Sequence, residues 1–506
     1  MLFLLALAVP FFILLFSVLH QHGVHRAGPP GPWPLPLIGN LHLLNHSSLH
    51  RCLWQLSLLH GPLMSLQLGL RPALVISSAK VAEKALKHCD LEFSNRPSMF
   101  GPSKISYGCS DIGFAPYGDH WRKVRRITMP HLFTAKKVRS FRAVREQEVA
   151  RTIQGIIATS VRRGGMVNIG ETVLPLALSI ICRIAFGRDY AEEVNGRELL
   201  REVQAALGGL FLRDYFGWLG GLVDRLREAT WNLERVFEEM DAFYEKMIEE
   251  HRQNQRHRHQ RRVRKLPEEE EEEDTIDVLL GDGNLTVEQV KAVLMDLIIG
   301  GTDTNSATLE WAMTALMKNP RVMVAAQQEM RALLQNKGRD WHNGMVNEDD
   351  LDSLPYLKAV VKEALRLYPP APLLIPRETV QVRGKTVIDG YEIRPKTMVY
   401  VNAWAIGRDP DVWGEDAEEF LPERFLTKGL DRNEFGFLAF GAGRRKCPGM
   451  DMGIGIVELA LANMLYRFDW ELPEGVREED IDVNVQPGIT MHRKTELFLV
   501  ARECTL

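Results

Sequence analysis

A single cysteine near the C-terminus lies among glycines and basic side chains. Residues 440–449 read FGAGRRKCPG, and the apolar stretch at 450–468 predicts a buried helix that begins just after Cys447. Free N–H groups at a helix N-terminus and nearby cations both favour a thiolate, and glycines leave room for backbone N–H groups beside the sulfur. We therefore expect Cys447 to be an anion that serves as a nucleophile or as a metal ligand.

A long helix with polar groups at its centre is predicted at 286–318. A capping-box pattern precedes it and an Asn-Pro pair follows it, so it should span roughly 50 Å. Its centre reads GGTDT (300–304), and each glycine there costs on the order of 1 kcal/mol relative to alanine. Either these residues allow tight packing with local hydroxyl-to-carbonyl bonds, or a ligand approaches the backbone and Asp303 and Thr304 transfer protons beside it. Both explanations remain open from this stretch alone.

A second helical pattern carries a carboxylate and an arginine on one face. Glu363 and Arg366 are three residues apart, and the later motif PERF supplies Arg424. A buried carboxylate bridged by two guanidinium groups would form a structural clamp, because the double ion pair keeps it ionised and fixed. We expect this role for the three residues rather than catalysis.

An aromatic residue and a cation are spaced for contact in the stretch GFAPYGDHWRKVRRI (113–127). Trp121 and Arg125 are four residues apart, so they could cover a planar ligand and bind its carboxylate, or form an ordinary surface cation–π pair. A thiolate, a helix with a polar centre and several arginines together suit haem iron and its propionates. The other side of this helix is basic through Arg122, Lys123 and Arg126.

The composition is that of a large globular protein. The chain has 506 residues, of which 45% are hydrophobic and 25% charged, with a net charge of −4. Because a nucleic-acid-binding surface needs a basic excess, no nucleic-acid partner is expected. None of the six cysteines forms a CxxC pair, which argues against a zinc site or a disulfide scaffold and indicates a reducing compartment.

The N-terminal stretch 1–19 contains no charged side chain. As a helix it would span roughly 28 Å, close to the ~30 Å hydrocarbon core, so we expect a transmembrane anchor. A cleaved signal peptide is the alternative, but it calls for a basic segment before the apolar run and small residues after it. Arg26 follows the span, which favours a single-pass protein with a cytosolic body. The glycosylation sequons at Asn45 and Asn284 would then stay unmodified.

The remaining chain divides into a short connection and one large body. Residues 20–40 are predicted to be a juxtamembrane and proline-rich hinge, with a semi-rigid extended strut at 29–40. Residues 41–506 are expected to form one catalytic domain, mainly α with small β-sheets. The basic-to-acidic stretch at 252–274 is interpreted as a solvated surface loop. Short β-like runs occur at 63–70, 73–77, 379–393 and 496–501.

These motifs resemble the cytochrome P-450 superfamily over nearly the whole chain. Its haem-loop pattern F-x-x-G-x-R-x-C-x-G is met by 440–449, and its oxygen-binding pattern [AG]-G-x-[DE]-T by 300–304. The E-x-x-R and W-x-x-x-R patterns are met by the two helical pairs described above. A proline-rich strut after an N-terminal anchor is typical of the microsomal form, and stretches such as PPAPLLIPRE (369–378) resemble the plant A-type subgroup. Small departures from the family pattern occur at Gly300, Asn305 and Ala439, of which Gly300 would widen the space over a haem.

The resemblance implies a cytochrome P-450 fold that binds haem b. Cys447 would be the axial iron ligand, and Asp303 and Thr304 would pass protons during oxygen cleavage. The residues implied in cofactor binding are Cys447, Arg445, Trp121, Arg125, Arg377, Phe440, Gly441 and Gly449. Of these, the three arginines would pair with the haem propionates and Trp121 would donate a hydrogen bond to one of them.

The implied activity is an NADPH- and O2-dependent monooxygenase on the endoplasmic reticulum membrane. Electrons would come from NADPH–cytochrome P-450 reductase, which would dock on Arg122, Lys123, Arg126, Arg444 and Lys446. The substrate would be a hydrophobic plant specialised metabolite such as a terpenoid, an alkaloid precursor or a phenylpropanoid. Alternatives are a haem-thiolate isomerase or dehydratase, and a membrane-anchored haem electron carrier or sensor. By family position, substrate would be lined by 99–114, 207–218, 296–304, 371–375 and 487–491.

Overall fold

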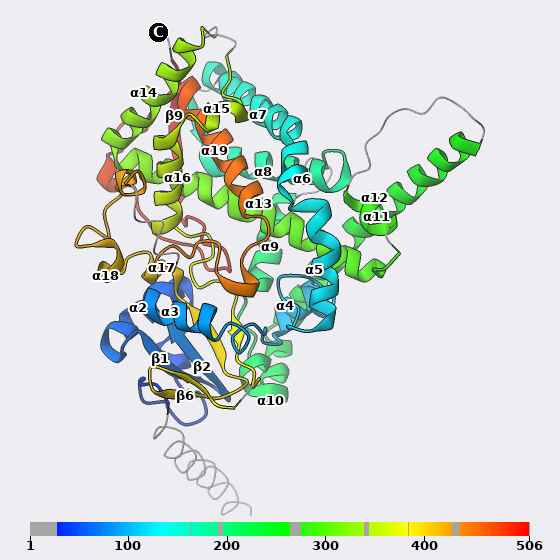
Figure 1. The fold of residues 1–506 in the computed structure, drawn as a ribbon, viewed down its shortest axis with the longest axis vertical. Helices are drawn as coiled ribbons and strands as arrows, with labels where there is room; N and C mark the ends of the chain where they lie inside the picture. Colours follow the sequence, from blue (N-terminus) through cyan, green and yellow to red (C-terminus); the bar gives the residue numbers. More distant parts are fainter. Residues whose placement is uncertain are drawn as a thin grey trace, which may run out of the picture.

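A central helix organises the structure. The computed structural model describes residues 28–504 except 163, 191–195, 264–274, 282, 339–343, 383 and 428–434, so the predicted anchor at 1–19 lies outside the described residues. Helix α13 (Val287–Lys318) crosses the middle of the molecule, as Figure 1 shows. The predicted capping box closes its start, since Thr286 and Gln289 exchange side-chain-to-backbone hydrogen bonds.

Helix α8 (Ile169–Phe186) packs along α13 at the core of the protein. Gly301 permits this approach, because a Cβ atom at that position would lie only 2.6 Å from the Ile181 side chain. Among the described residues α8 is the one helix long and apolar enough to cross a membrane, but 67% of it is buried inside the protein. It is therefore a core helix.

The other helices surround this pair. Helices α7 (Arg142–Arg162), α16 (Pro355–Leu367) and α19 (Met450–Arg467) complete the main core with α14 (Pro320–Asn336). The remaining α-helices are α2 (Leu49–His60), α3 (Ala79–Glu83), α4 (Phe100–Ile105), α5 (Asp119–Leu132), α6 (Ala135–Ser140), α9 (Gly196–Leu207), α10 (Arg213–Leu226), α11 (Ala229–Val263), α12 (Thr275–Gly281), α15 (Glu348–Leu351), α17 (Ala403–Ile406) and α18 (Pro410–Trp413).

Three small sheets accompany the helices, as the mainly α prediction requires. The largest has the order β1-β2-β7-β4, in which β7 runs parallel to β2 and the other pairs are antiparallel. The second has the order β3-β9-β8, and the third pairs β5 with β6. The strands are β1 (Leu63–Leu68), β2 (Arg71–Ile76), β3 (Met166–Asn168), β4 (Arg377–Glu378), β5 (Thr386–Ile388), β6 (Tyr391–Ile393), β7 (Met398–Val401), β8 (Phe468–Glu471) and β9 (Phe498–Glu503).

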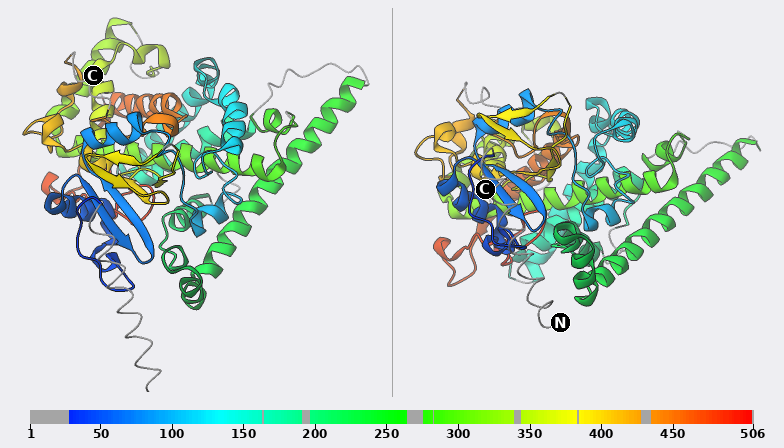
Figure 2. Two further views of the ribbon diagram at one scale, coloured as in Figure 1. Left: turned by 60° about the horizontal axis from the view of Figure 1, so that its bottom comes forward. Right: turned by 90° about the horizontal axis from the view of Figure 1, so that it is seen from below.

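Two expectations for local structure are corrected. The charged stretch predicted as a loop at 252–274 is helical as far as Val263, because α11 continues through good helix formers and extends away from the body (Figure 2). The proline-rich stretch does not stand free: the carbonyl of Pro30 accepts a bond from the N–H of Ser65, 2.8 Å away on β1. Its Trp33 is 74% exposed.

Candidate active site

The loop that carries Cys447 is a tight turn between the sheet region and α19. Gly441 and Gly443 have φ angles of +65° and +68°, which only glycine adopts without strain. A Cβ atom at Gly443 would also lie 2.2 Å from Oδ1 of Asp90. These two glycines therefore serve the path of the turn rather than access to the sulfur. Helix α19 begins at Met450 with Gly449 as its N-cap, three residues after the cysteine, as predicted.

Burial opposes the thiolate form of Cys447, while neighbouring groups favour it. Its side chain opens into an internal cavity, and burial raises the pKa of the thiol above its ordinary value. The Gly449 N–H and the charges of Arg125 and Lys446 lower the pKa, but by less than burial raises it. The predicted effects of the helix N-terminus and the cations are present, but they offset only part of the cost of removing the sulfur from water. A metal ion on the sulfur would supply the missing stabilisation.

The cavity at Cys447 has a volume of about 300 Å³ and lies between α13 and the cysteine loop. Thr304, Gly300 and Gly301 face it from α13. A Cβ atom at Gly300 would meet no other atom within 4 Å, so this position leaves open space above the cysteine. Gly301 thus serves helix packing, as the first explanation has it, while Gly300 leaves open space on the cavity side, and the predicted proton transfer stays a prediction. From the cysteine side the lining includes Phe440, Gly441, Arg445, Lys446, Cys447, Pro448 and Gly449.

The two polar side chains of the GGTDT motif point in different directions. The Thr304 hydroxyl lines the cavity and donates to the Gly300 carbonyl at 2.6 Å. Asp303 is 4% exposed and does not line the cavity. Its Oδ1 lies 2.8 Å from Nε2 of His492, and its Oδ2 is buried without a hydrogen-bond partner. The predicted acid–alcohol pair is therefore divided, with Thr304 at the cavity and Asp303 behind it.

Arginines make the cavity strongly cationic. Burial and the neighbouring charge of Arg377 lower the pKa of Arg445 to about 10, because the cations repel one another. The guanidinium of Arg445 donates to the carbonyls of Ser94, Ile112 and Ala115, and the Trp121 N–H also donates to Ile112. No ion pair within the described ranges neutralises the four cavity arginines, which are Arg96, Arg125, Arg377 and Arg445.

These features fit haem. Four arginines against the single carboxyl of Asp296 leave an excess of cations in the lining that suits the two propionates, and the open thiol and the space at Gly300 suit an iron. Arg125 is the best placed of the predicted propionate partners, since among the described contacts it makes only a cation–π contact with Trp121 at 5.3 Å. Trp121, predicted to donate to a propionate, instead donates to the Ile112 carbonyl at 3.1 Å.

The structure brings the three clamp residues together inside the protein. Arg366 donates to both oxygens of Glu363, at 2.6 and 2.7 Å, and Arg424 donates to Oε1 at 3.0 Å. The side chains of Glu363 and Arg366 are fully buried. Arg366 also donates to the carbonyls of Gly407, Ala417 and Glu419, so the clamp joins α16 to the chain before the cysteine loop.

A second hollow adjoins the cavity. It has a volume of about 300 Å³ and shares Arg96, Leu374 and Ile375 with the cavity. Residues from four of the five segments predicted to line substrate meet in it, including Phe114, Leu210, Pro372 and Ile489. The fifth segment, 296–304, lines the cavity itself through Asp296, Leu297, Gly300, Gly301 and Thr304.

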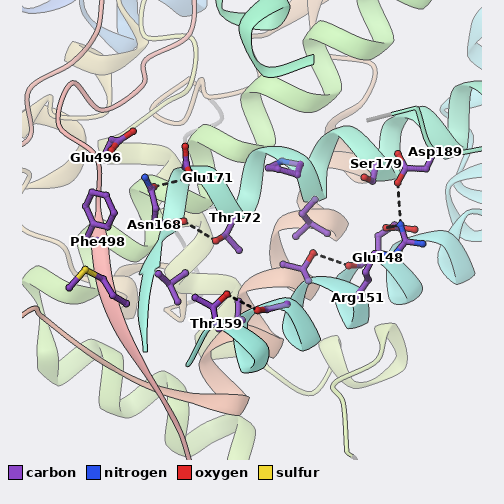
Figure 3. Close-up of a pocket in the computed structure, with 17 residues that line it drawn as sticks. Glu148, Arg151, Thr159, Asn168, Glu171, Thr172, Ser179, Asp189, Glu496 and Phe498 are labelled. Carbon is purple, nitrogen blue, oxygen red and sulfur yellow. Dashed lines mark hydrogen bonds and ion pairs between the residues drawn. The ribbon is translucent and has the colours of Figure 1, made fainter. Parts of the chain in front are cut away.

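A more voluminous hollow lies elsewhere in the described part of the chain. It has a volume of about 800 Å³ and opens between α7, α8, β3 and β9 (Figure 3). Three of its charged side chains form ion pairs, since Arg151 lies 3.2 Å from both Glu148 and Asp189. It contains no thiol, so the chemistry lies at the smaller cavity.

Sequence reasoning missed two residues at the site. Arg96 donates to the carbonyls of Gly113, Ile375 and Pro376. In the sequence it is a single cation in a stretch without a helical or strand pattern, so nothing there predicts these contacts. His492 is separated from Asp303 by 189 residues, so no spacing could link them.

Comparisons with known proteins assign the family. The family model "Cytochrome P450" matches residues 29–500. The chain is 43% identical to 5-OH-xanthotoxin synthase of Pastinaca sativa, over 98% of this chain and 97% of that protein. It is 43% identical to 6,7,8-trihydroxycoumarin synthase of the same plant, over 94% and 93%. It is 46% identical to cytochrome P450 71A9 of Glycine max, again over 94% and 93%.

A solved structure shows the same fold. A zebrafish cytochrome P450 determined with abiraterone superposes with a TM-score of 0.72 and 24% identity, covering 90% of this chain and 99% of that one. The predicted fold is thus confirmed, and haem b is the cofactor of this family. The chain belongs to the cytochrome P450 family and is a haem-thiolate monooxygenase similar to plant members of the 71 group.

Proposed function

We propose that this monooxygenase hydroxylates, or otherwise oxidises, a hydrophobic plant specialised metabolite, with coumarins as the first candidates. The observation that carries the proposal is the cavity at Cys447, which continues into a hollow lined by Phe114, Leu210 and Ile489. Planar aromatic lactones suit such walls, and two similar plant proteins are named as synthases of hydroxylated products of this class. Terpenoids, alkaloid precursors and other phenylpropanoids are the next candidates.

The residues divide the work around the cofactor. Haem, when bound, would supply oxygen activation, and a cysteine thiolate on its iron would favour this chemistry. Cys447 would hold the iron, while Arg125 with Arg377 and Arg445 would neutralise the propionates. The Thr304 hydroxyl, which already donates to Gly300, would hold a proton at the distal side. Asp303 would resupply that proton from behind, through its contact with His492.

The partner and the location complete the proposal. Electrons would come from NADPH–cytochrome P-450 reductase, and residues 1–19 would anchor the chain in the endoplasmic reticulum membrane with 20–40 as hinge and 41–506 as a cytosolic catalytic domain. Exposed apolar side chains support a membrane-facing surface. Leu70 is 70% exposed and lies beside α10, where its N–H donates to the Tyr215 carbonyl at 2.9 Å. On and next to α10 the exposed side chains are Trp218, Leu219, Leu222, Val223, Leu226 and Trp231.

Isotopic oxygen tests the function. The full chain is incubated with reductase, NADPH and ¹⁸O₂ and given a panel of coumarins, terpenoids and alkaloid precursors. We expect one ¹⁸O atom in the product, coumarins to be turned over best, and a Cys447→Ser variant to be inactive. Turnover without oxygen uptake would support the isomerase or dehydratase alternative. Turnover of terpenoids alone would contradict the proposed substrate class.

A further inference from the structure

Two carboxyl groups meet where the loop at 106–115 crosses α13. Asp111 lies on this loop and is 0% exposed. Asp296 lies on α13, two turns before Thr304, and lines the cavity at Cys447. Both carboxyls flank Gly113 and bind adjacent N–H groups of the loop, and Oδ1 of Asp111 is buried without a hydrogen-bond partner.

The pair also binds the backbone of the loop. Oδ2 of Asp296 accepts from the N–H of Ile112 at 2.6 Å and from that of Gly113 at 3.3 Å, and Oδ2 of Asp111 accepts from the N–H of Phe114 at 2.7 Å. Gly113 has no room for a side chain here, since a Cβ atom would lie 3.0 Å from Oδ1 of Asp296. Three consecutive backbone N–H groups of the loop thus donate hydrogen bonds to the two carboxyls.

This loop connects the cavity walls to the cofactor residues. Ile112 and Gly113 line the cavity, and Phe114 lines the adjoining hollow. The Ile112 carbonyl accepts from both Trp121 and Arg445, at 3.1 and 3.2 Å. A shift of the loop would therefore move the substrate wall and the residues beside the haem together.

A hydrogen bond between two carboxyls needs a proton. Burial raises the pKa of Asp296 well above its ordinary value, and the negative charge of Asp111 raises it further. Burial raises the pKa of Asp111 to about 6, while its contacts with Phe114 and Asp296 lower it. The Arg96 guanidinium faces both carboxyls and favours their ionised forms. Asp111 also faces Arg445 and Cys109. Asp296 also faces Tyr244.

We propose that Asp111 and Asp296 share one proton and act as positioning residues, which hold the loop at 106–115 against α13 and so fix the wall of the substrate space. With the proton in place, Asp296 donates to Asp111 and the loop stays closed. When the proton is lost at higher pH, two adjacent carboxylates repel each other and the loop is released from α13.

The test compares the haem-loaded full chain with its Asp296→Asn variant. An asparagine accepts from Ile112 and donates permanently to Asp111, so it keeps the bonds but cannot lose the proton. Carbon monoxide rebinding to the reduced haem after flash photolysis reports the opening of the loop, because carbon monoxide itself does not titrate. Between about pH 6 and about pH 9, we expect the rebinding rate of the wild type to rise on the order of tenfold, which is the factor that corresponds to the loss of one hydrogen bond. The rebinding rate of Asp296→Asn should not change over this range.

Infrared spectra give a second readout that needs no turnover. Other buried acids such as Glu458 also titrate in this range, so the readout is the difference between spectra. The wild type should lose a carboxylic acid component over the same pH range that Asp296→Asn and Asp111→Asn both lack. The exposed Asp480→Asn variant is the matched control and should behave as wild type in both measurements. A flat wild-type rebinding rate, the same acceleration in Asp296→Asn, or a pH-dependent carboxylic acid band of equal size in wild type and both single variants would overturn the proposal.

Discussion

Asp303 of the GGTDT motif contacts His492 on the side of α13 that does not line the cavity. Burial lowers the pKa of His492, but the charge and hydrogen bond of Asp303, with the charge of Glu310, raise it more, so the net pKa lies above its ordinary value. The ion pair is therefore complete below the ordinary histidine pKa and weakens as the pH rises through the elevated one. In the functional proposal above, this contact sets the proton supply to Thr304.

Replacing His492 should change proton delivery without removing the cofactor. A His492→Leu variant leaves the Asp303 carboxyl buried without a partner, so we expect several-fold less product per NADPH consumed and more hydrogen peroxide. His492→Gln can still donate to Asp303, so its yield should stay close to wild type and lose its pH dependence. Equal yields in wild type and His492→Leu, with both proteins retaining the thiolate-type carbon monoxide spectrum, would show that the contact has no such role.

At this scale the sequence identifies residues better than their orientations. The positions of Cys447 and Thr304 at the cavity can be predicted from their motifs, because each motif places that side chain beside the cofactor. The direction of Asp303 and the use of the Arg445 guanidinium for backbone carbonyls depend on contacts hundreds of residues apart in the chain, such as the bond from Arg445 to Ala115. No local pattern encodes these contacts.

The helices themselves follow from the sequence where caps and periodicity agree. Helix α13 begins and ends within one residue of its predicted range because a capping box and an Asn-Pro pair enclose it. Strand β7 was missed, since its four buried residues have no alternation of polar and apolar side chains and gain their structure from pairing with β2 and β4. Helix α11 was partly missed because charge density, rather than helix propensity, guided that prediction.

A buried acid on α19 makes the helical core sensitive to pH. Glu458 is 7% exposed, and burial raises its pKa to about 7, although Lys358 and Lys362 lower it. A raised carboxyl pKa stabilises the fold at low pH, and this stability is lost as the pH rises through about 7.

Glu458→Gln should remove this sensitivity. The amide needs no proton to stay neutral, so above about pH 8 we expect the variant to be more stable than wild type by about 3 kcal/mol, the equivalent of the shift from the ordinary carboxyl value. Thermal unfolding at several pH values measures the difference, with the exposed Glu474→Gln as control. Parallel pH profiles for wild type and Glu458→Gln would contradict the burial effect.

Over the whole molecule, the exposed cations near the cysteine loop are fewer than the sequence suggested. Arg444 is 50% exposed and lies 3.0 Å from Asp90, just as Arg122 is 50% exposed and lies 2.6 Å from Asp119, and Lys446 is half-buried and lines the cavity. Helix α5 retains exposed Arg122 and Arg126, and it reaches the loop through Phe133, which lies 3.4 Å from the position of a Cβ atom at Gly449. Reductase docking should therefore depend mainly on α5.

Charge reversal on α5 tests this docking surface. Arg122→Glu combined with Arg126→Glu should slow the first electron transfer from reductase about tenfold at low salt, with the difference shrinking as salt screens the charges. Lys494→Glu combined with Arg502→Glu reverses the same number of charges near the C-terminus and should leave the rate unchanged. An equal effect of both double variants would indicate a general charge effect instead of docking.

The proposed membrane-facing surface combines parts of the chain that are far apart in sequence. The N–H of Gly69 donates to the Ile38 carbonyl at 3.2 Å, so the proline-rich stretch, the β1–β2 turn and α10 lie together at one end of the molecule (Figure 1). Trp33, Trp218 and Trp231 are 74%, 79% and 76% exposed there. Aromatic side chains of this kind suit the interface between lipid and water.

Quenching of tryptophan fluorescence by brominated lipids measures whether this surface touches the bilayer. With the full chain in vesicles, Trp218→Phe and Trp231→Phe should each remove part of the quenched emission, because these indoles would lie within reach of the lipid. Trp470→Phe is the matched control, since Trp470 is 7% exposed in the β3-β9-β8 sheet and should contribute only unquenched emission. If the quenched emission survives the loss of both Trp218 and Trp231, α10 does not face the membrane, and the chain would be held there by residues 1–19 alone.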